Sequence, residues 1–104
     1  MIDKNNSISF SKDEILEIFV DIEYIMVSLA EIGRYYSVPE NNDILAYNAE
    51  TTKFIDDNGV TTKLANIRKL INSKFDLSLG DDDMDDLERA CEDIKYWKRP
   101  DGRQ

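Results

Sequence analysis

The residues of this sequence best suited to chemistry are the acids between positions 76 and 93. This stretch holds nine aspartates and glutamates against one base, Arg89. One or two acids in the first turn of a helix are stabilised by the positive end of its dipole, by about 0.3–1 kcal/mol each. Five aspartates lie within positions 81–86 and repel one another, which favours a role in binding a cationic partner. A solvated helix start is the alternative interpretation.

Other chemistry finds little support in the residue types. The chain contains no histidine, which removes the usual bases for a serine or cysteine nucleophile, and its single cysteine, Cys91, is expected to fill an apolar helix face. The aspartates of the acid run partly follow the spacing of an EF-hand calcium loop, but Asp86 stands where that loop requires glycine. We therefore predict a protein that is not an enzyme and that has no cofactor and no metal site.

Three helices are predicted before the acid run. Ser11 and Glu14 form a capping-box pattern that starts a helix running from Lys12 to about Tyr36. A second helix is predicted from about Asn42 to Asp57, ended by Asn58-Gly59, which favours left-handed backbone. Thr61 or Thr62 is expected to cap a third helix, whose apolar face includes Leu64, Ile67, Leu70, Ile71 and Phe75.

A fourth helix is predicted after the acid run, with Met84, Leu87, Cys91, Ile94 and Lys98 along one side and Pro100 at its end. On this helix Asp85, Glu88, Glu92 and Tyr96 share the outward side, which gives an acidic stripe ending in an aromatic ring. Neutralising Asp82, Asp85 and Glu88 is therefore expected to leave the fold intact or slightly more stable, because like charges are removed.

The first helix has a very wide apolar arc, with Ile15, Phe19, Ile22, Met26 and Leu29 on one face and further apolar residues on both flanks. This arc predicts a central helix that contacts neighbours on several sides. Glu23 lies inside the arc and is expected to be less exposed than the other acids of the helix. Its partner is expected to be Lys63, Lys69 or Lys74; otherwise its carboxylate reaches water at a gap between helices.

The predicted fold is therefore all-α, a compact bundle of about four helices with a long central first helix. One domain is expected over residues 1–104, with flexible ends at 1–10 and 100–104. The net charge of −9 disfavours direct contact with nucleic acid or an anionic membrane and favours a cationic protein partner. Without a signal-peptide or membrane-spanning pattern, the expected location is the cytoplasm. A monomer is expected rather than a homodimer.

Several short segments resemble small acidic immunity proteins that bacteria use against nuclease bacteriocins and contact-dependent toxins. Ser7-Ile8-Ser9 with the capped start at Ser11 is similar to the opening of colicin and pyocin nuclease immunity proteins. Gly80-Asp81-Asp82-Asp83 followed by Ile94-Lys95-Tyr96-Trp97 resembles their last helix. Tyr35-Tyr36, which closes the first helix here, resembles their toxin-binding tyrosine pair. Phe54-Ile55-Asp56-Asp57-Asn58-Gly59, followed by the predicted helix from Leu64 to Phe75, resembles a stretch of the immunity protein against a tRNA-cleaving colicin.

The resemblance implies an immunity protein that masks a cationic toxin, a DNase or RNase. Charge pattern and resemblance together give the candidate partner-binding residues: Asp81, Asp82, Asp83, Asp85, Asp86, Glu88, Glu92, Tyr96, Tyr35 and Tyr36. Two alternatives stay open. One is a phage-encoded nucleic-acid mimic that inhibits a host defence nuclease, and the other is a dimeric helical adaptor whose long first helix pairs with itself.

Overall fold

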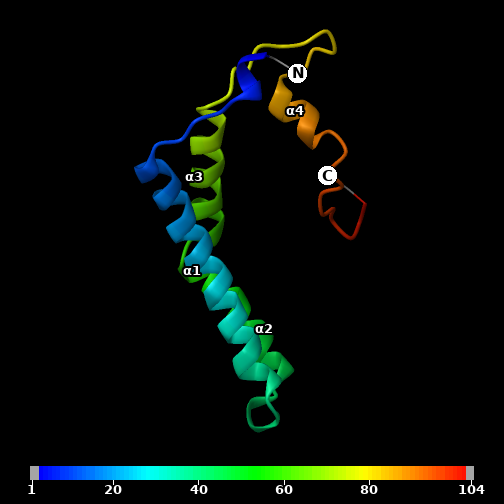
Figure 1. Ribbon diagram of the computed structural model, residues 1–104. Helices are drawn as coiled ribbons and strands as arrows, with labels where there is room; N and C mark the ends of the chain where they lie inside the picture. Colours follow the sequence, from blue (N-terminus) through cyan, green and yellow to red (C-terminus); the bar gives the residue numbers. More distant parts are fainter. Residues whose placement is uncertain (1–2, 103–104) are drawn as a thin grey trace. The chain divides into compact units, whose positions relative to one another are not determined.

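The computed structural model describes residues 3–102, which are helical and contain no strand. The all-α class is thereby confirmed. The helices are α1 (Lys12–Ser37), α2 (Ile44–Asp57), α3 (Val60–Asn72) and the short α4 (Asp86–Cys91), with 3-10 turns at Asp3–Asn6 and Pro39–Asn41 (Figure 1). The chain divides into two compact units: residues 10–73, here called the three-helix unit, and residues 3–9 with 74–102, called the terminal unit. That residues 1–104 behave as one domain stays a prediction.

Helix α1 begins and ends close to where the sequence predicts. The Ser11 hydroxyl accepts a hydrogen bond from the Glu14 amide at 3.1 Å, and the Glu14 carboxylate accepts one from the Ser11 amide at 2.8 Å. This is the predicted capping box. At the other end Val38 is extended, as expected for a residue that precedes a proline.

Helices α2 and α3 follow one another along α1 (Figure 1). At 1.5 Å per residue, α1 is about 39 Å long, and α2 and α3 together are about 40 Å long. Residues of α2 lie beside the C-terminal half of α1, and residues of α3 lie beside its N-terminal half. Since α1 contacts both partners, the expected central position of the first helix is confirmed within the three-helix unit.

The corner between α2 and α3 explains how two helices can line one longer helix. Gly59 has φ of +58°, and the Asn58 amide donates to the Phe54 carbonyl at 3.2 Å, so α2 ends where the sequence predicts. The Tyr24 hydroxyl of α1 donates to the Asn58 side chain at 2.9 Å. The predicted threonine cap of α3 is wrong: the helix begins at Val60 with Gly59 as its N-cap, so Thr61 and Thr62 already lie in its first turn.

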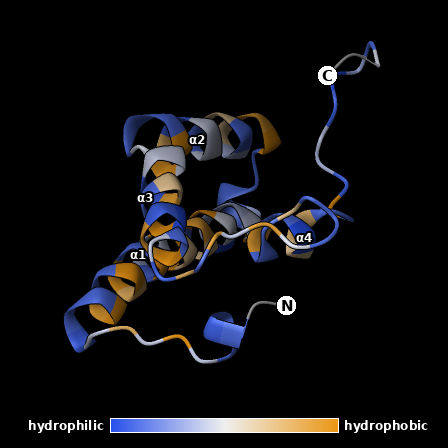
Figure 2. Cartoon of the chain, turned by 90° about the horizontal axis from the view of Figure 1, so that it is seen from above, coloured by the Kyte–Doolittle hydropathy of each residue, from blue (hydrophilic) through white to orange (hydrophobic). Residues whose placement is uncertain are grey.

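The core of the three-helix unit is small. Among the described residues of the chain, only Phe54 and Val60 are buried apolar residues, 9% and 6% exposed. Helix α1 packs against α2 and α3 with the side that carries Ile18, Ile25 and Ile32, which are half-buried. Hydrophobic residues recur turn after turn along α1 (Figure 2), yet much of its apolar arc is exposed. The wide arc therefore exceeds what two neighbours can cover.

The expectation for Glu23 is wrong for the same reason. Its side of the helix faces away from α2 and α3, and Glu23 is exposed, whereas Asp21 and Glu14 are half-buried. Among the described residues it forms no ion pair, and Lys63 lies instead over the Tyr24 ring, 5.7 Å from the centroid. The apolar arc of α1 was too wide to predict which of its sides would pack against α2 and α3.

The two later helices are shorter than predicted. Helix α3 ends at Asn72, so Phe75 lies beyond it, and α4 ends at Cys91, well before Pro100. Glu92 and Asp93 follow the last turn of α4, where negative charge is unfavourable beside the helix C-terminus, and Ile94 turns back by donating to the Cys91 carbonyl at 3.1 Å. Cys91 is exposed, so its expected place on a buried face is also wrong.

The predicted flexible ends are only partly within the structure. Residues 1, 2, 103 and 104 lie outside the described part of the chain. Within it, Asp3–Asn6 forms a 3-10 turn and Asn5 is buried, so residues 3–6 do not form the free end that was expected.

Candidate functional site: partner-binding surfaces

The acid run of the terminal unit begins with a tight turn. The Gly80 amide donates to the Met84 carbonyl at 2.8 Å, and the Asp83 amide donates to the Gly80 carbonyl at 3.1 Å. Asp83 has φ of +60°, a conformation that aspartate tolerates better than most residues. A Cβ on Gly80 would lie 2.7 Å from the Arg89 guanidinium, so a side chain there would require that guanidinium to shift. The turn therefore places Arg89 among the acids.

Arg89 occupies the centre of the acid cluster. Its guanidinium donates two parallel hydrogen bonds to Asp82, each 2.7 Å, a third to Asp86 at 2.7 Å, and a fourth to the Met84 carbonyl at 3.0 Å. These hydrogen bonds hold the pKa of Asp82 well below its ordinary value, and Asp82 and Asp86 raise the pKa of Arg89. One base thus neutralises part of the repulsion among the aspartates.

Asp86 is buried, with only 2% of its surface exposed. Besides Arg89, it accepts a hydrogen bond from the Asn5 amide group at 2.8 Å. Asn5 also bonds both main-chain groups of Asp76, accepting at 2.8 Å and donating at 3.0 Å. Asp86 therefore joins the two segments of the terminal unit. No local sequence signal marks this pairing, because the partners are more than seventy positions apart.

Two further acids of the run cap α4. The Asp85 carboxylate accepts from the Glu88 amide at 2.8 Å, and the Asp85 amide donates to the Glu88 carboxylate at 3.2 Å. With Asp82 and Asp86, four of the predicted partner-binding acids thus have partners inside the unit. Neutralising Asp82 would remove its bidentate ion pair with Arg89, which argues against an unharmed fold, whereas asparagine at 85 and glutamine at 88 could still cap α4. The effect of the combined change on the fold stays a prediction.

The predicted acidic stripe does not form. Since α4 ends at Cys91, Glu92 is its C-cap and Tyr96 lies outside the helix, 67% exposed. Asp81, Asp83 and Glu92 are exposed and stay available to a partner. The terminal unit therefore offers a partner fewer carboxylates than the sequence suggests.

Tyr35 and Tyr36 lie in the last turns of α1, in the three-helix unit. Tyr35 is 57% exposed, and its ring meets that of Tyr36 edge-on, with centroids 4.9 Å apart. Tyr36 is half-buried and makes a second edge contact with Tyr47 of α2, at 6.3 Å. The two predicted tyrosines and Tyr47 therefore form one aromatic cluster, here called the tyrosine cluster, where α1 ends beside α2.

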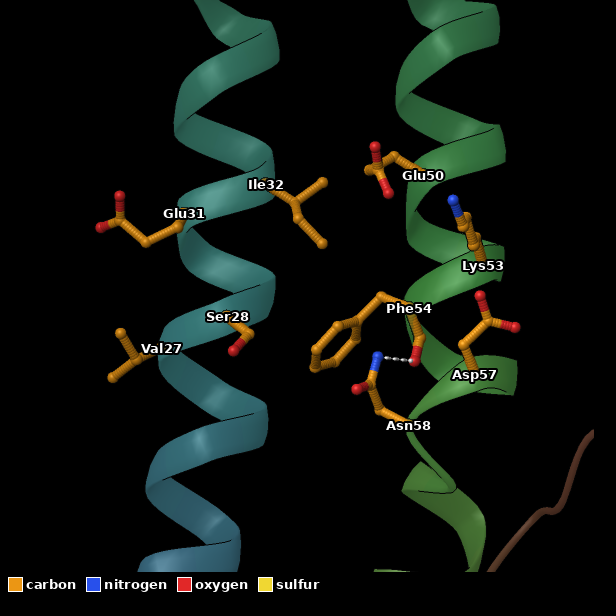
Figure 3. Close-up of a pocket in the computed structure, with 9 residues that line it drawn as sticks. All are labelled: Val27, Ser28, Glu31, Ile32, Glu50, Lys53, Phe54, Asp57 and Asn58. Atoms are coloured by element: carbon orange, nitrogen blue, oxygen red, sulfur yellow. Dashed lines mark hydrogen bonds between the residues drawn. The ribbon is translucent and has the colours of Figure 1, made fainter.

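This tyrosine cluster borders a groove between α1 and α2. Figure 3 shows the part of the groove farther from the tyrosines. One part, about 440 Å³, is lined by Val27, Ser28, Glu31, Ile32, Glu50, Lys53, Phe54, Asp57 and Asn58. An adjoining part, about 460 Å³, is lined by Tyr35, Tyr36 and the shared residues Glu31, Ile32 and Glu50. Figure 3 shows Ile32 facing Glu50 and Phe54 across the groove. Sequence reasoning missed Glu31 and Glu50, although both lie on predicted helices.

The groove is acidic as well as aromatic. Its lining holds three acids, Glu31, Glu50 and Asp57, and one base, Lys53. Glu31 forms an ion pair with Arg34, and in Figure 3 its carboxylate points away from α2. Partial burial raises the pKa of Tyr36, and the charges of Glu50 and Asp43 and the neighbouring Tyr35 add to the shift. An acidic groove ending in an exposed tyrosine suits a cationic protein surface.

The structure thus brings the predicted residues together in two sets. The eight residues from Asp81 to Tyr96 belong to the terminal unit, and the tyrosine pair belongs to the three-helix unit. In the part of the chain that the structure describes, no group of three or more cysteines or acids is placed to hold a metal ion. No helix in that part is long and apolar enough to cross a membrane.

Comparison of the chain with protein-family models, with curated proteins and with solved structures gives no match.

Proposed function

We propose that this chain is an immunity protein: an acidic binding protein that neutralises a cognate cationic bacterial nuclease in the cytoplasm and catalyses no reaction itself. The observation that carries the proposal is the tyrosine cluster beside Glu31 and Glu50 at the acidic groove of α1 and α2. The resemblance of short segments to bacteriocin immunity proteins agrees with it.

The charge of the whole chain supports a cationic partner. With 22 acids against 13 bases, the protein attracts the basic substrate cleft of a nuclease and repels its nucleic-acid substrate. Complementary charge mainly raises the association rate, whereas buried aromatics supply most of the binding energy at interfaces. In this protein the exposed acids would raise the association rate, and Tyr35 would supply binding energy.

The tyrosine pair is a better anchor than the acid run. Tyr35 is exposed while Tyr36 and Tyr47 hold its neighbourhood in place, so little side-chain freedom is lost on binding. Asp82, Asp85, Asp86 and Glu88 already have partners within the terminal unit. A nucleic-acid mimic would need those carboxylates free, and no observation favours that alternative.

The test is inhibition of a nuclease toxin encoded beside the gene. The purified toxin is assayed on DNA and RNA while this chain is added up to an equimolar amount. We expect loss of nuclease activity at a one-to-one ratio and protection of cells that express both proteins. Full nuclease activity with a twofold excess of this chain would reject the proposal.

Two tyrosine variants locate the interface. Tyr35→Ala is expected to weaken toxin binding by about 30-fold or more, as for an aromatic anchor. Tyr96→Ala is the matched comparison, since it removes another exposed tyrosine, from the terminal unit. Leu45→Ala, an exposed apolar residue of α2 outside the groove, serves as the neutral control. A large loss with Tyr96→Ala alone would move the interface to the terminal unit.

A further inference from the structure

Helix α1 carries an apolar face that no part of the three-helix unit covers. Ile15, Phe19, Ile22 and Met26 lie on this face and are between 41% and 57% exposed. Their spacing of four, three and four residues places them on one stripe, as in the seam between two paired helices. The stripe is thus suited to a second helix with the same repeat.

Further apolar side chains widen this stripe. Leu16, Val20 and Val27 flank it and are between 43% and 62% exposed. Between Ile15 and Ala30 the only charge inside the arc is Glu23. The exposed face of α1, defined by Ile15, Leu16, Phe19, Val20, Ile22, Met26 and Val27, is therefore almost uniformly apolar.

The size of this face can be compared with known interfaces. If a large apolar side chain presents roughly 200 Å² when fully exposed, seven that are about half exposed present on the order of 600–700 Å². That exceeds most single apolar patches on monomers, which reach about 300–600 Å². It approaches the roughly 800 Å² per partner of a standard interface, so a polar rim would complete a stable dimer.

We infer that the exposed face of α1 pairs with the same face of a second copy of this chain. A two-fold pair presents each copy with a stripe of identical repeat, so apolar side chains meet apolar side chains. A cationic protein would instead be drawn to carboxylates, and Glu23 is the one carboxylate in the arc. The inference does not rest on the proposed function, because Tyr35 and Glu50 lie outside this face and Val27 is the one residue of the face that also lines the groove. It replaces the expectation of a monomer.

The test is the mass of the full chain in solution, measured by sedimentation equilibrium between about 5 and 200 μM, a range that populates a dimer of micromolar dissociation constant. We expect a species of twice the 12.0 kDa chain mass. Because both copies carry net negative charge, the dimer should become tighter at higher salt. A monomer throughout this concentration range would overturn the inference.

Variants then decide whether α1 forms the interface. Phe19→Glu and Met26→Glu each place a charge in the seam, and each is expected to raise the dimer dissociation constant at least about 100-fold. Leu45→Glu places the same charge at an exposed apolar site of α2 and should leave the constant unchanged. Circular dichroism checks that the helices persist, and Phe19→Ser is the milder variant if either charge unfolds the chain. Dimers that persist in folded seam variants would overturn the inference.

Discussion

Asp82 shows how a single acid can be structural within a cluster that resembles a binding surface. Its two hydrogen bonds from Arg89 lower its pKa from the ordinary value of 3.8. Because the lowering occurs only in the folded protein, ionised Asp82 stabilises the terminal unit at pH values above 3.8. That contribution declines as the pH falls from about 4 through the lowered pKa.

Asp82→Asn should therefore loosen the terminal unit at neutral pH and lose its effect in strong acid. The measurement is amide hydrogen exchange of Gly80 and Asp83, whose hydrogen bonds close the turn. We expect faster exchange in Asp82→Asn at pH 7 and a shrinking difference towards about pH 2. Asp81→Asn, at an exposed neighbour in the same turn, is the control. Equal exchange in both variants would show that Arg89 does not hold the turn.

Asp86 links residues 3–6 to the acid run within the terminal unit. Asp86→Ala leaves the buried Asn5 amide group without this acceptor and takes one carboxylate from Arg89. An unsatisfied buried donor costs about 1–3 kcal/mol, so residues 3–6 should lose their order. Loss of the long-range nuclear Overhauser contacts between Asn5 and Asp76 is the expected readout. Glu92→Ala, at the exposed C-cap of α4, should preserve those contacts.

Thr51 of α2 is a single residue whose replacement should stabilise the protein. Its hydroxyl oxygen is buried without a hydrogen-bond partner among the described residues. Thr51→Val replaces that hydroxyl by a methyl group of similar volume and should raise the free energy of unfolding by about 1 kcal/mol. Thr52→Val, on the exposed side of the helix, should change it little. Chemical denaturation measures both, and a loss of stability in Thr51→Val would contradict the assignment.

At the scale of elements, the corner between α2 and α3 decides how α1 is covered. Gly59→Ala keeps only an ordinary contact with Thr62, at 3.8 Å, so its cost comes from the left-handed backbone and should be about 1–2 kcal/mol. Gly33→Ala is the matched control, because it lies within α1 with no atom within 4 Å of the added methyl group. There alanine should stabilise by up to about 1 kcal/mol. Thermal unfolding should therefore shift in opposite directions.

At the scale of the whole molecule, salt separates the two proposed associations. Binding of a cationic nuclease should weaken as ionic strength rises from about 0.05 to 0.5 M, chiefly through a slower association rate. Self-association through the exposed face of α1 should tighten over the same range. Surface binding kinetics for the toxin and sedimentation for the dimer measure the two effects. A salt-independent association rate with the toxin would contradict the role of charge.

The sequence by itself determined what depends on neighbouring residues. Ser11 and Glu14 cap α1, Asn58-Gly59 ends α2, and periodic apolar residues predict the long helices, because each signal acts within a few positions. The all-α class followed from these local signals. The premature end of α4 was missed, since a short helix depends on its surroundings more than on propensity.

Tertiary structure alone decided which side of each element is covered. The wide apolar arc of α1 could face neighbours in several directions, and only packing against α2 and α3 leaves Phe19 and Glu23 exposed. From the sequence, the acid run was likewise interpreted as an exposed surface. Asn5 lies some eighty positions before Asp86, so no local pattern could predict that the two side chains pair. Contacts between residues distant in sequence depend on the whole fold, so the sequence could suggest the candidate surfaces without choosing among them.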